Sequence, residues 1–199
     1  MVGIIDYGVG NLFSLRSSFA AIGVEAFVSG DAAELAKADR LILPGVGAFG
    51  DAAEKLRATG LDAFVREQAA AGKPLMGICL GMQLLFERSF EYGEHFGLGL
   101  LKGQVVGMSG RLPEGLKIPH MGWNALKLTK AAKLLEEGSY VYFVHSFYAE
   151  NCEDSIAAVT DYGIPITAAV EKGNIFGCQF HPEKSGNVGL AILKKFCEV

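Results

Sequence analysis

The sequence has no excess of basic residues and no long uncharged apolar run. Lys and Arg number 18 against 22 Asp and Glu in 199 residues, a formal net charge of −4. We therefore expect no nucleic-acid partner, because no basic surplus is available to neutralise phosphates. The longest uncharged stretch, Pro74 to Phe86, is shorter than the about 20 residues that a membrane-spanning helix needs, so we expect no membrane segment either.

Paired cysteines and a secretory signal are also missing. The four cysteines (Cys79, Cys152, Cys178 and Cys197) are scattered without a C-x-x-C pair, which indicates reduced thiols. No basic segment followed by an apolar run opens the sequence, so we expect a cytoplasmic protein. Half of the residues are hydrophobic and Gly and Pro number only 26 and 6, which excludes disordered and low-complexity classes. We expect one domain over residues 1–199.

The first half alternates between short apolar runs and segments with helical spacing. The predicted strands are Val2–Asp6, Val24–Val28, Leu41–Leu43 and Pro74–Ile78. The predicted helices are one capped by Asn11, one starting at Asp31, Asp51–Ala71 with a break near Gly60, and Leu80–Arg88. Such alternation predicts an α/β fold, with a mainly parallel open sheet covered by helices on both faces.

The second half is predicted to be rich in β-structure. The strand-like runs are Ala125–Leu128, Tyr140–Val144, Ile156–Thr160, Ile166–Val170 and Ile175–Phe180, and a helix over Val188–Phe196 follows. Lys172-Gly173-Asn174 is typical of a hairpin turn between the last two strands.

The pentapeptide Gly77-Ile78-Cys79-Leu80-Gly81 lies where a buried strand meets a helix. Its spacing is that of the nucleophile elbow G-x-S-x-G, with Cys in place of Ser. In that turn the nucleophile projects at the carboxyl end of the sheet, and the backbone N–H of Leu80 can donate to an oxyanion. The helix N-terminus would favour the reactive thiolate. A buried cysteine between two packing glycines explains the pentapeptide equally well.

A thiol nucleophile needs a base, and His181-Pro182-Glu183 offers one with a carboxylate beside it. In an extended segment residues two apart project to the same face, so Glu183 would orient the His181 ring. The alternative is a loop histidine beside a solvated glutamate. A zinc deaminase H-x-E motif is excluded, because it needs a downstream P-C-x-x-C and only Cys197 follows.

Pro44-Gly45-Val46-Gly47 follows a strand on the same predicted edge as Cys79. A glycine-rich loop there can present N–H groups to an anion, although an ordinary turn has the same letters. Gly8-x-Gly10 is not a dinucleotide fingerprint, because position 13 is Phe13. His95 and His120 are expected to be exposed loop residues, and His145 a residue at a strand end with its hydrogen bonds satisfied.

Gly77-x-Cys79-x-Gly81-x-Gln83 with a late His181-Pro182-Glu183 resembles the class I glutamine amidotransferases over the whole chain. Further segments resemble one branch of that family, in which a glutaminase works as half of a heterodimer with an ammonia-consuming TIM-barrel cyclase. These segments are Ile4–Leu12, Pro44–Phe49, Pro119–Asn124 and Gln179–Ser185.

The resemblance implies roles for individual residues. Cys79, His181 and Glu183 would form the catalytic triad, and backbone N–H groups of Val46 or Gly47, with Leu80, the oxyanion hole. Gln83 would help hold L-glutamine, with His145, Ser146 and Phe147 at its amino-acid end. Asn11, Trp123, Tyr142 and Lys184 would face the cyclase. This chemistry, acyl transfer through a thioester, requires no metal and no organic cofactor.

Two other classes of protein share parts of the pattern. A stand-alone cysteine hydrolase would have the elbow but no need of the Gly8–Asn11 and Pro119–Asn124 segments. A flavodoxin-like binding module would have no reason to place a Cys, a His and a Glu around one cleft.

Overall fold

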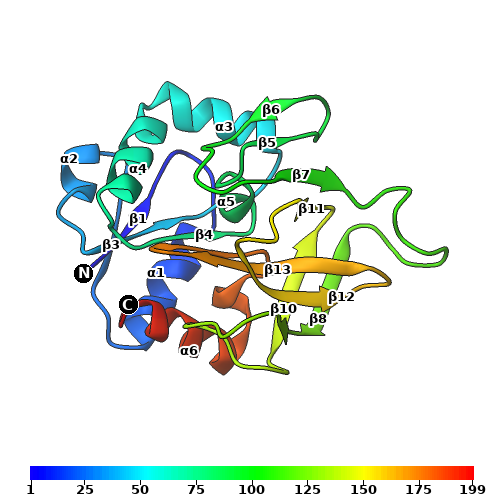
Figure 1. Cartoon of the computed structure of the whole chain (residues 1–199). Helices are drawn as coiled ribbons and strands as arrows, with labels where there is room; N and C mark the ends of the chain where they lie inside the picture. The colour runs from blue at the N-terminus through cyan, green and yellow to red at the C-terminus, as the bar shows by residue number, and fades with distance from the viewer.

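The fold is built around a central eight-stranded sheet (Figure 1). The computed structural model describes all of residues 1–199. The strand order of the sheet is β2-β1-β3-β4-β14-β13-β12-β9. The parallel strands are β1 (Val2–Ile5), β2 (Ala26–Ser29), β3 (Arg40–Leu43), β4 (Leu75–Ile78) and β14 (Ile175–Cys178). An antiparallel extension follows, consisting of β13 (Pro165–Lys172), β12 (Ile156–Asp161) and β9 (Lys127–Leu128).

Helices cover both faces of this sheet. The helices on one face are α2 (Ala32–Leu35), α3 (Phe49–Ala58) and α4 (Leu61–Ala70), and those on the other are α1 (Leu12–Ala21) and α6 (Gly186–Phe196). Successive residues of one strand serve the two cores, since Leu41 and Leu43 pack with the first group of helices and Ile42 with the second. The predicted parallel sheet with two covered faces is confirmed, as is the helix break at Gly60.

The second half adds two small sheets beside the main one (Figure 1). One pairs β8 (His120–Ala125) with β10 (Tyr140–His145), and the other contains β11 (Phe147–Glu150), β7 (Gln104–Gly107), β5 (Arg88–Ser89) and β6 (His95–Phe96). The predicted hairpin turn is confirmed, because Lys172 pairs with Ile175 across Gly173 and Asn174. The predicted Ala125–Leu128 strand is wrong as one unit: the chain changes sheets at the fully buried Leu126.

Two local predictions about helices are also wrong. Helix α5 covers only Leu80–Gln83 and does not continue to Arg88. The carbonyls of residues 84–86 accept hydrogen bonds from the N–H groups of residues 98–101, and these bonds replace the helical ones. Asn11 precedes α1, but its side chain makes no capping hydrogen bond.

The final helix, α6, packs unusually close to the short 3₁₀ helix η1 (Pro182–Lys184) that precedes it. A Cβ atom added at Gly189 would lie 1.8 Å from the carbonyl oxygen of Pro182, which is backbone and cannot move aside. This contact requires a residue without a side chain. No helix of the chain is long and apolar enough to cross a membrane.

Replacing Gly189 with alanine tests that contact. We expect Gly189→Ala to lower the free energy of unfolding by about 1–3 kcal/mol, because overpacking outweighs the helix propensity of alanine. Urea denaturation would measure the change. Asn187→Ala, at an exposed position of the same helix, should alter stability by less than about 0.5 kcal/mol. Equal stability of the two variants would contradict the close packing of α6 on η1.

Candidate active site

Cys79 occupies a sharp turn between β4 and α5. Its φ of 55° and ψ of −113° are strained for a residue with a side chain. A Cβ at Gly77 would lie 2.5 Å from the Gly81 carbonyl oxygen, and one at Gly81 would lie 1.9 Å from the Leu43 carbonyl oxygen. The glycines are therefore required by close backbone approach, and the geometry is that of a nucleophile elbow. Because α5 is a single turn, few peptide dipoles add up at Cys79, and the nearest N–H groups contribute most.

The other three cysteines lack such a position. None of them lines the cavity at which Cys79 lies. Burial raises the pKa of Cys152 to about 11 and also raises the pKa values of Cys178 and Cys197. These thiols therefore stay protonated at neutral pH, and Cys79 is the cysteine in a position to react.

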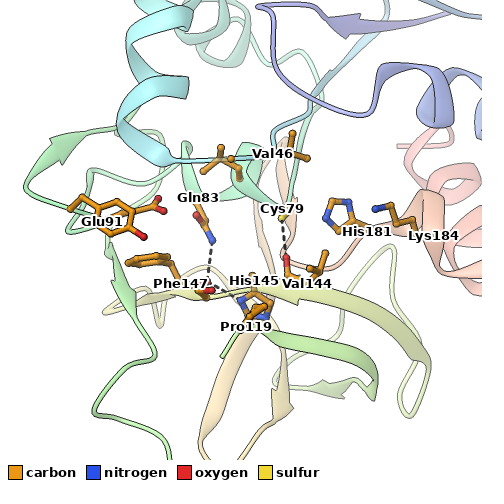
Figure 2. Close-up of a pocket in the computed structure, with 14 residues that line it drawn as sticks. Val46, Cys79, Gln83, Glu91, Pro119, Val144, His145, Phe147, His181 and Lys184 are labelled. Atoms are coloured by element: carbon orange, nitrogen blue, oxygen red, sulfur yellow. Dashed lines mark hydrogen bonds between the residues drawn. The ribbon is translucent and has the colours of Figure 1, made fainter. Parts of the chain in front are cut away.

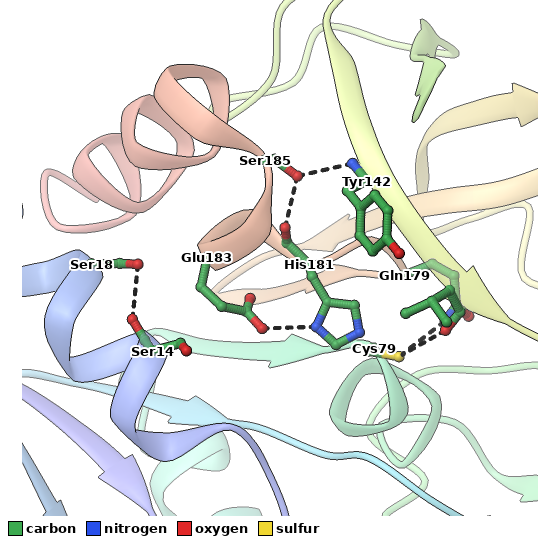
Figure 3. A network of polar contacts seen from close by, with 9 residues as sticks. Ser14, Ser18, Cys79, Tyr142, Gln179, His181, Glu183 and Ser185 are labelled. Atoms are coloured by element: carbon green, nitrogen blue, oxygen red, sulfur yellow. Dashed lines mark hydrogen bonds and ion pairs between the residues drawn. The ribbon is translucent and has the colours of Figure 1, made fainter. Parts of the chain in front are cut away.

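Parallel pairing of β4 with β14 brings His181 close to Cys79. The N–H of Cys79 donates to the Cys178 carbonyl at 2.7 Å, so both strands end at the same level. Cys79 Sγ itself lies 3.8 Å from Gln179 Nε2 and 4.0 Å from the Val144 carbonyl (Figures 2 and 3). β14 ends at Cys178, and His181 lies three residues further along the chain, with its ring beside the sulfur.

Glu183 orients the His181 ring, with 2.8 Å between Oε1 and Nδ1 (Figure 3). The sequence predicted that an extended segment would place Glu183 beside His181, and this prediction is wrong. Pro182 begins the 3₁₀ turn η1, which folds Glu183 back toward the ring. Both side chains are almost completely buried, and Glu183 Oε2 has no hydrogen-bond partner. A buried carboxylate with an unpaired oxygen strongly favours a positive charge on the neighbouring imidazole.

The electrostatics of His181 follow from these neighbours. Burial alone would lower its pKa, but Cys79 and Glu183 outweigh burial, and the pKa of His181 rises to about 9. The imidazolium therefore persists through neutral pH beside the sulfur, as a proton store for acyl-transfer chemistry needs.

A cavity of about 370 Å³ opens over Cys79 (Figure 2). Its walls come from the elbow, from the loop after β3, from the β10–β11 connection and from the segment after β5. The lining residues are Val46, Gly47, Cys79, Leu80, Gln83, Glu91, Tyr92, Pro119, Val144, His145, Ser146, Phe147, His181 and Lys184. The sequence assigned ten residues to the triad, the oxyanion hole and glutamine. Nine of them line this cavity, and the tenth, Glu183, is buried beside His181.

The loop after β3 provides free backbone donors next to the elbow. The N–H groups of Val46 and Gly47 donate to no acceptor in the protein. Leu80 is the first residue of α5, so its N–H has no partner inside that helix. Gly47 has a φ of +93°, which an L-residue rarely adopts, while Tyr7 donates its hydroxyl to the Pro44 carbonyl at 2.7 Å and fixes the start of the loop.

Gln83 reaches the cavity but is already engaged within the protein. Its Nε2 donates to the Phe147 carbonyl and to Gln179 Oε1, each at 3.0 Å. Its amide nitrogen therefore holds the wall of the cavity in place. The prediction that His120 is exposed is wrong: its ring is fully buried and hydrogen-bonded to His145.

Glu91 is a cavity residue that the sequence analysis missed. It lies across the cavity from Cys79 (Figure 2), and its Oε2 accepts from the Phe49 N–H at the start of α3 at 2.7 Å. Burial raises its pKa. Nothing in its glycine-rich segment distinguishes it from the nearby Glu87 and Glu94, so no sequence signal marks it.

The four residues assigned to a partner surface lie on neighbouring elements. Trp123 and Tyr142 are cross-strand neighbours of β8 and β10, with ring centroids 6.0 Å apart. Lys184 is exposed beside His181, and Asn11 precedes α1, which contacts η1. Trp123 is 52% exposed and Met121 of the same strand 59%, so β8 presents apolar side chains to solvent.

Comparison with known proteins agrees with this geometry. Residues 3–199 match the family described as "Glutamine amidotransferase class-I". The chain is 52% identical over 204 residues to the imidazole glycerol phosphate synthase subunit HisH of Wolinella succinogenes, covering all of both proteins. It is 52% identical over 203 residues to the subunit of the same name from Caldanaerobacter subterraneus subsp. tengcongensis, covering 100% of this chain and 98% of that protein. A crystal structure of a glutamine amidotransferase superposes with a TM-score of 0.78 at 21% identity, covering 99% and 97% of the two chains.

The pKa of His181 can be measured by following its ring nitrogens through a pH titration by NMR. We expect a midpoint near 9 in the native chain. Cys79→Ala and Glu183→Gln each remove a negative neighbour, so each should move the midpoint toward acid pH. Cys152→Ala, a change outside the cavity, should leave it in place. An unchanged midpoint in the first two variants would contradict the assigned electrostatics.

Proposed function

The chain belongs to the class I glutamine amidotransferase family, and from this premise we propose that it is the glutaminase subunit of imidazole glycerol phosphate synthase. It hydrolyses glutamine to glutamate and ammonia, and the ammonia serves histidine biosynthesis. The observation that carries the proposal is the convergence of Cys79, His181 and two sets of free N–H groups on one cavity.

Cys79 attacks the side-chain carboxamide carbon of glutamine. His181 holds the thiol proton and donates it to the departing nitrogen, while Glu183 keeps the ring oriented and stabilises its positive charge. Ammonia leaves, and a γ-glutamyl thioester on Sγ remains. Water then attacks the thioester carbon, with His181 as the base, and glutamate is released.

The tetrahedral intermediates carry a negative oxygen that needs fixed donors. Leu80 provides one N–H at the elbow, and Val46 or Gly47 provides another from the loop after β3. The elbow is sterically locked, but the loop is not, because a Cβ at Gly47 would meet no atom within 4 Å. The second donor is therefore the adjustable one.

Glutamine also needs groups for its charged end. The carboxylate of Glu91 lies opposite Cys79 and attracts the α-ammonium group of the substrate. His145, Ser146 and Phe147, at the β10–β11 connection, contact the amino-acid end from the other wall. The distance between these groups and Cys79 then selects the length of the glutamine side chain.

The partner in this proposal is the TIM-barrel cyclase subunit, with which the chain forms a heterodimer. The exposed apolar side chains of Met121 and Trp123 provide a surface for it. Tyr142 lies next to Trp123, and Lys184 and Asn11 lie on or beside the neighbouring elements η1 and α1. A second hollow of about 390 Å³ lies on the other side of Val46 and Gly47 and is lined by Gly8, Val9 and Gly10. A partner seated there would touch the adjustable loop directly. Ammonia must reach this partner before bulk water protonates it.

Removing the nucleophile tests the proposed function. We expect Cys79→Ala to release no glutamate from glutamine, because no thioester can form, while it still folds and binds the cyclase. The synthase reaction should continue when ammonia replaces glutamine, which separates loss of chemistry from loss of assembly. Glutamine-dependent turnover by the variant would exclude Cys79 as the nucleophile and favour a different hydrolase mechanism.

The adjustable loop predicts control by the partner. We expect glutamate release at saturating glutamine to rise roughly 10²–10³-fold when ligand-loaded cyclase is added, the usual effect of one oxyanion donor. The rise should appear in kcat, because the donor acts on the transition state and not on bound glutamine. Equal kcat with and without the cyclase would show that both donors already point inward in the free chain.

A further inference from the structure

A chain of buried polar groups connects the glutamine cavity with strand β8. The Phe147 carbonyl lies 2.8 Å from His145 Nδ1, and His145 Nε2 lies 3.1 Å from His120 Nδ1. His120 Nε2 then lies 2.8 Å from Asn124 Oδ1, and the other atom of that amide, Nδ2, lies 3.2 Å from the Asp161 carbonyl. The catalytic steps described above use neither His120 nor Asn124.

This chain has one hydrogen too few. Its two ends, the carbonyls of Phe147 and Asp161, can only accept. Four contacts need four hydrogens. Each of the two neutral imidazoles supplies one, and the Nδ2 group of Asn124 supplies one, so only three are available. One of the four contacts must therefore lack its hydrogen, and donation to Asp161 competes with donation to Phe147.

The rings cannot avoid this competition by turning away. His120 is fully buried and stacked between Tyr162 and Phe143, with ring centroids 4.0 and 4.9 Å away. His145 is also buried, and neither ring forms an ion pair with a carboxylate. Burial lowers the pKa of His145 to about 3 and lowers that of His120, so at neutral pH the pair does not bind the proton that would complete the chain.

We propose that Asn124 and His120 are positioning residues for glutamine binding, which act through His145 on the Phe147 carbonyl. When the Asn124 amide donates to Asp161, His120 gives its hydrogen to Asn124, and His145 is drawn to donate toward His120. When the hydrogen bond from Asn124 to Asp161 is broken, the hydrogens shift toward Phe147: His120 donates to His145, and His145 Nδ1–H donates to the Phe147 carbonyl. The second state adds a second hydrogen bond to the Phe147 carbonyl, beside the one from Gln83, and so fixes more firmly the wall that contacts the amino-acid end of glutamine.

Strand β8 makes this arrangement sensitive to events at the surface. Asn124 follows Trp123 directly, and Met121 and Trp123 are the exposed apolar residues of β8. The contact between Asn124 and Asp161 is the longest of the four, so a small displacement of β8 against β12 breaks it first. A molecule that covers β8 can thereby change the hydrogen-bond donor inside the cavity.

Two matched variants test this hydrogen-bond relay, which runs from Asn124 through His120 and His145 to the Phe147 carbonyl. Asn124→Leu and Thr160→Val each remove one side-chain hydrogen bond between β8 and β12, since Thr160 Oγ1 donates to the Ala125 carbonyl at 2.9 Å. Only the first removes the competing end of the chain and leaves two hydrogens for two contacts. We expect it to tighten glutamine binding by roughly two- to tenfold, the equivalent of one net hydrogen bond.

The binding constant would be measured by calorimetry on the full chain in a Cys79→Ala background, where no turnover occurs. Thr160→Val should bind glutamine as the parent does. Weaker binding by Asn124→Leu, or equal binding by the two variants, would show that Asn124 only supports packing and would overturn the proposal.

NMR of ¹⁵N-labelled histidine provides a second readout that needs neither glutamine nor turnover. The chain has only four histidines, so single variants assign the signals. We expect His145 to share its hydrogen between Nδ1 and Nε2 in the native chain, and to carry it on Nδ1 in Asn124→Leu. A hydrogen fixed on Nδ1 of the native protein would overturn the relay. The relay depends on the proposed function only because glutamine is taken as the ligand. If the tautomer shift is observed but the native protein releases no glutamate from glutamine, the proposed function is rejected and the relay is not.

Discussion

The parallel pairing of β4 with β14 is the constraint on which the site depends. It aligns two chain segments that lie a hundred residues apart, so the elbow after one strand meets the histidine after the other. The elbow needs a backbone so close to its surroundings that Gly77 and Gly81 admit no side chain. Any shift in this pairing would separate sulfur from imidazole, because both are placed by strand ends and not by flexible loops.

Around this rigid centre the molecule keeps one adjustable part. The loop after β3 is fixed at its start by the Tyr7 hydroxyl on the Pro44 carbonyl, but it becomes sterically free at Gly47. It also separates the catalytic cavity from the open hollow at Gly8–Gly10. In the proposed function this loop provides an oxyanion donor. A donor on a wall between the cavity and the surface is well suited to control from outside, since contact on one side changes what the other side presents.

Buried polar groups give the site its remaining properties. Glu183 keeps one oxygen unpaired in the interior and so favours positive charge on His181. The His145–His120–Asn124 chain has the opposite character, because it is neutral and short of one hydrogen. Native interiors usually satisfy such groups, and here both departures from that rule lie directly behind residues that line the cavity over Cys79, namely His181 and His145.

Sequence alone determined the features that short windows of residues control. Alternating apolar runs predicted the parallel sheet. The glycine spacing around Cys79 predicted the elbow, because the contact of Gly77 with the Gly81 carbonyl acts between near neighbours, although Gly81 is also limited by the distant Leu43 carbonyl. Only the tertiary structure decided what depends on distant partners. Helix α5 ends at Gln83 because the N–H groups of residues 98–101 bond the carbonyls of residues 84–86, which directly follow it. His120 is buried because Tyr162 and Phe143 enclose it. Glu91 joins the cavity through the Phe49 N–H. Such contacts form between segments far apart in the chain, so no local pattern of residues predicts them.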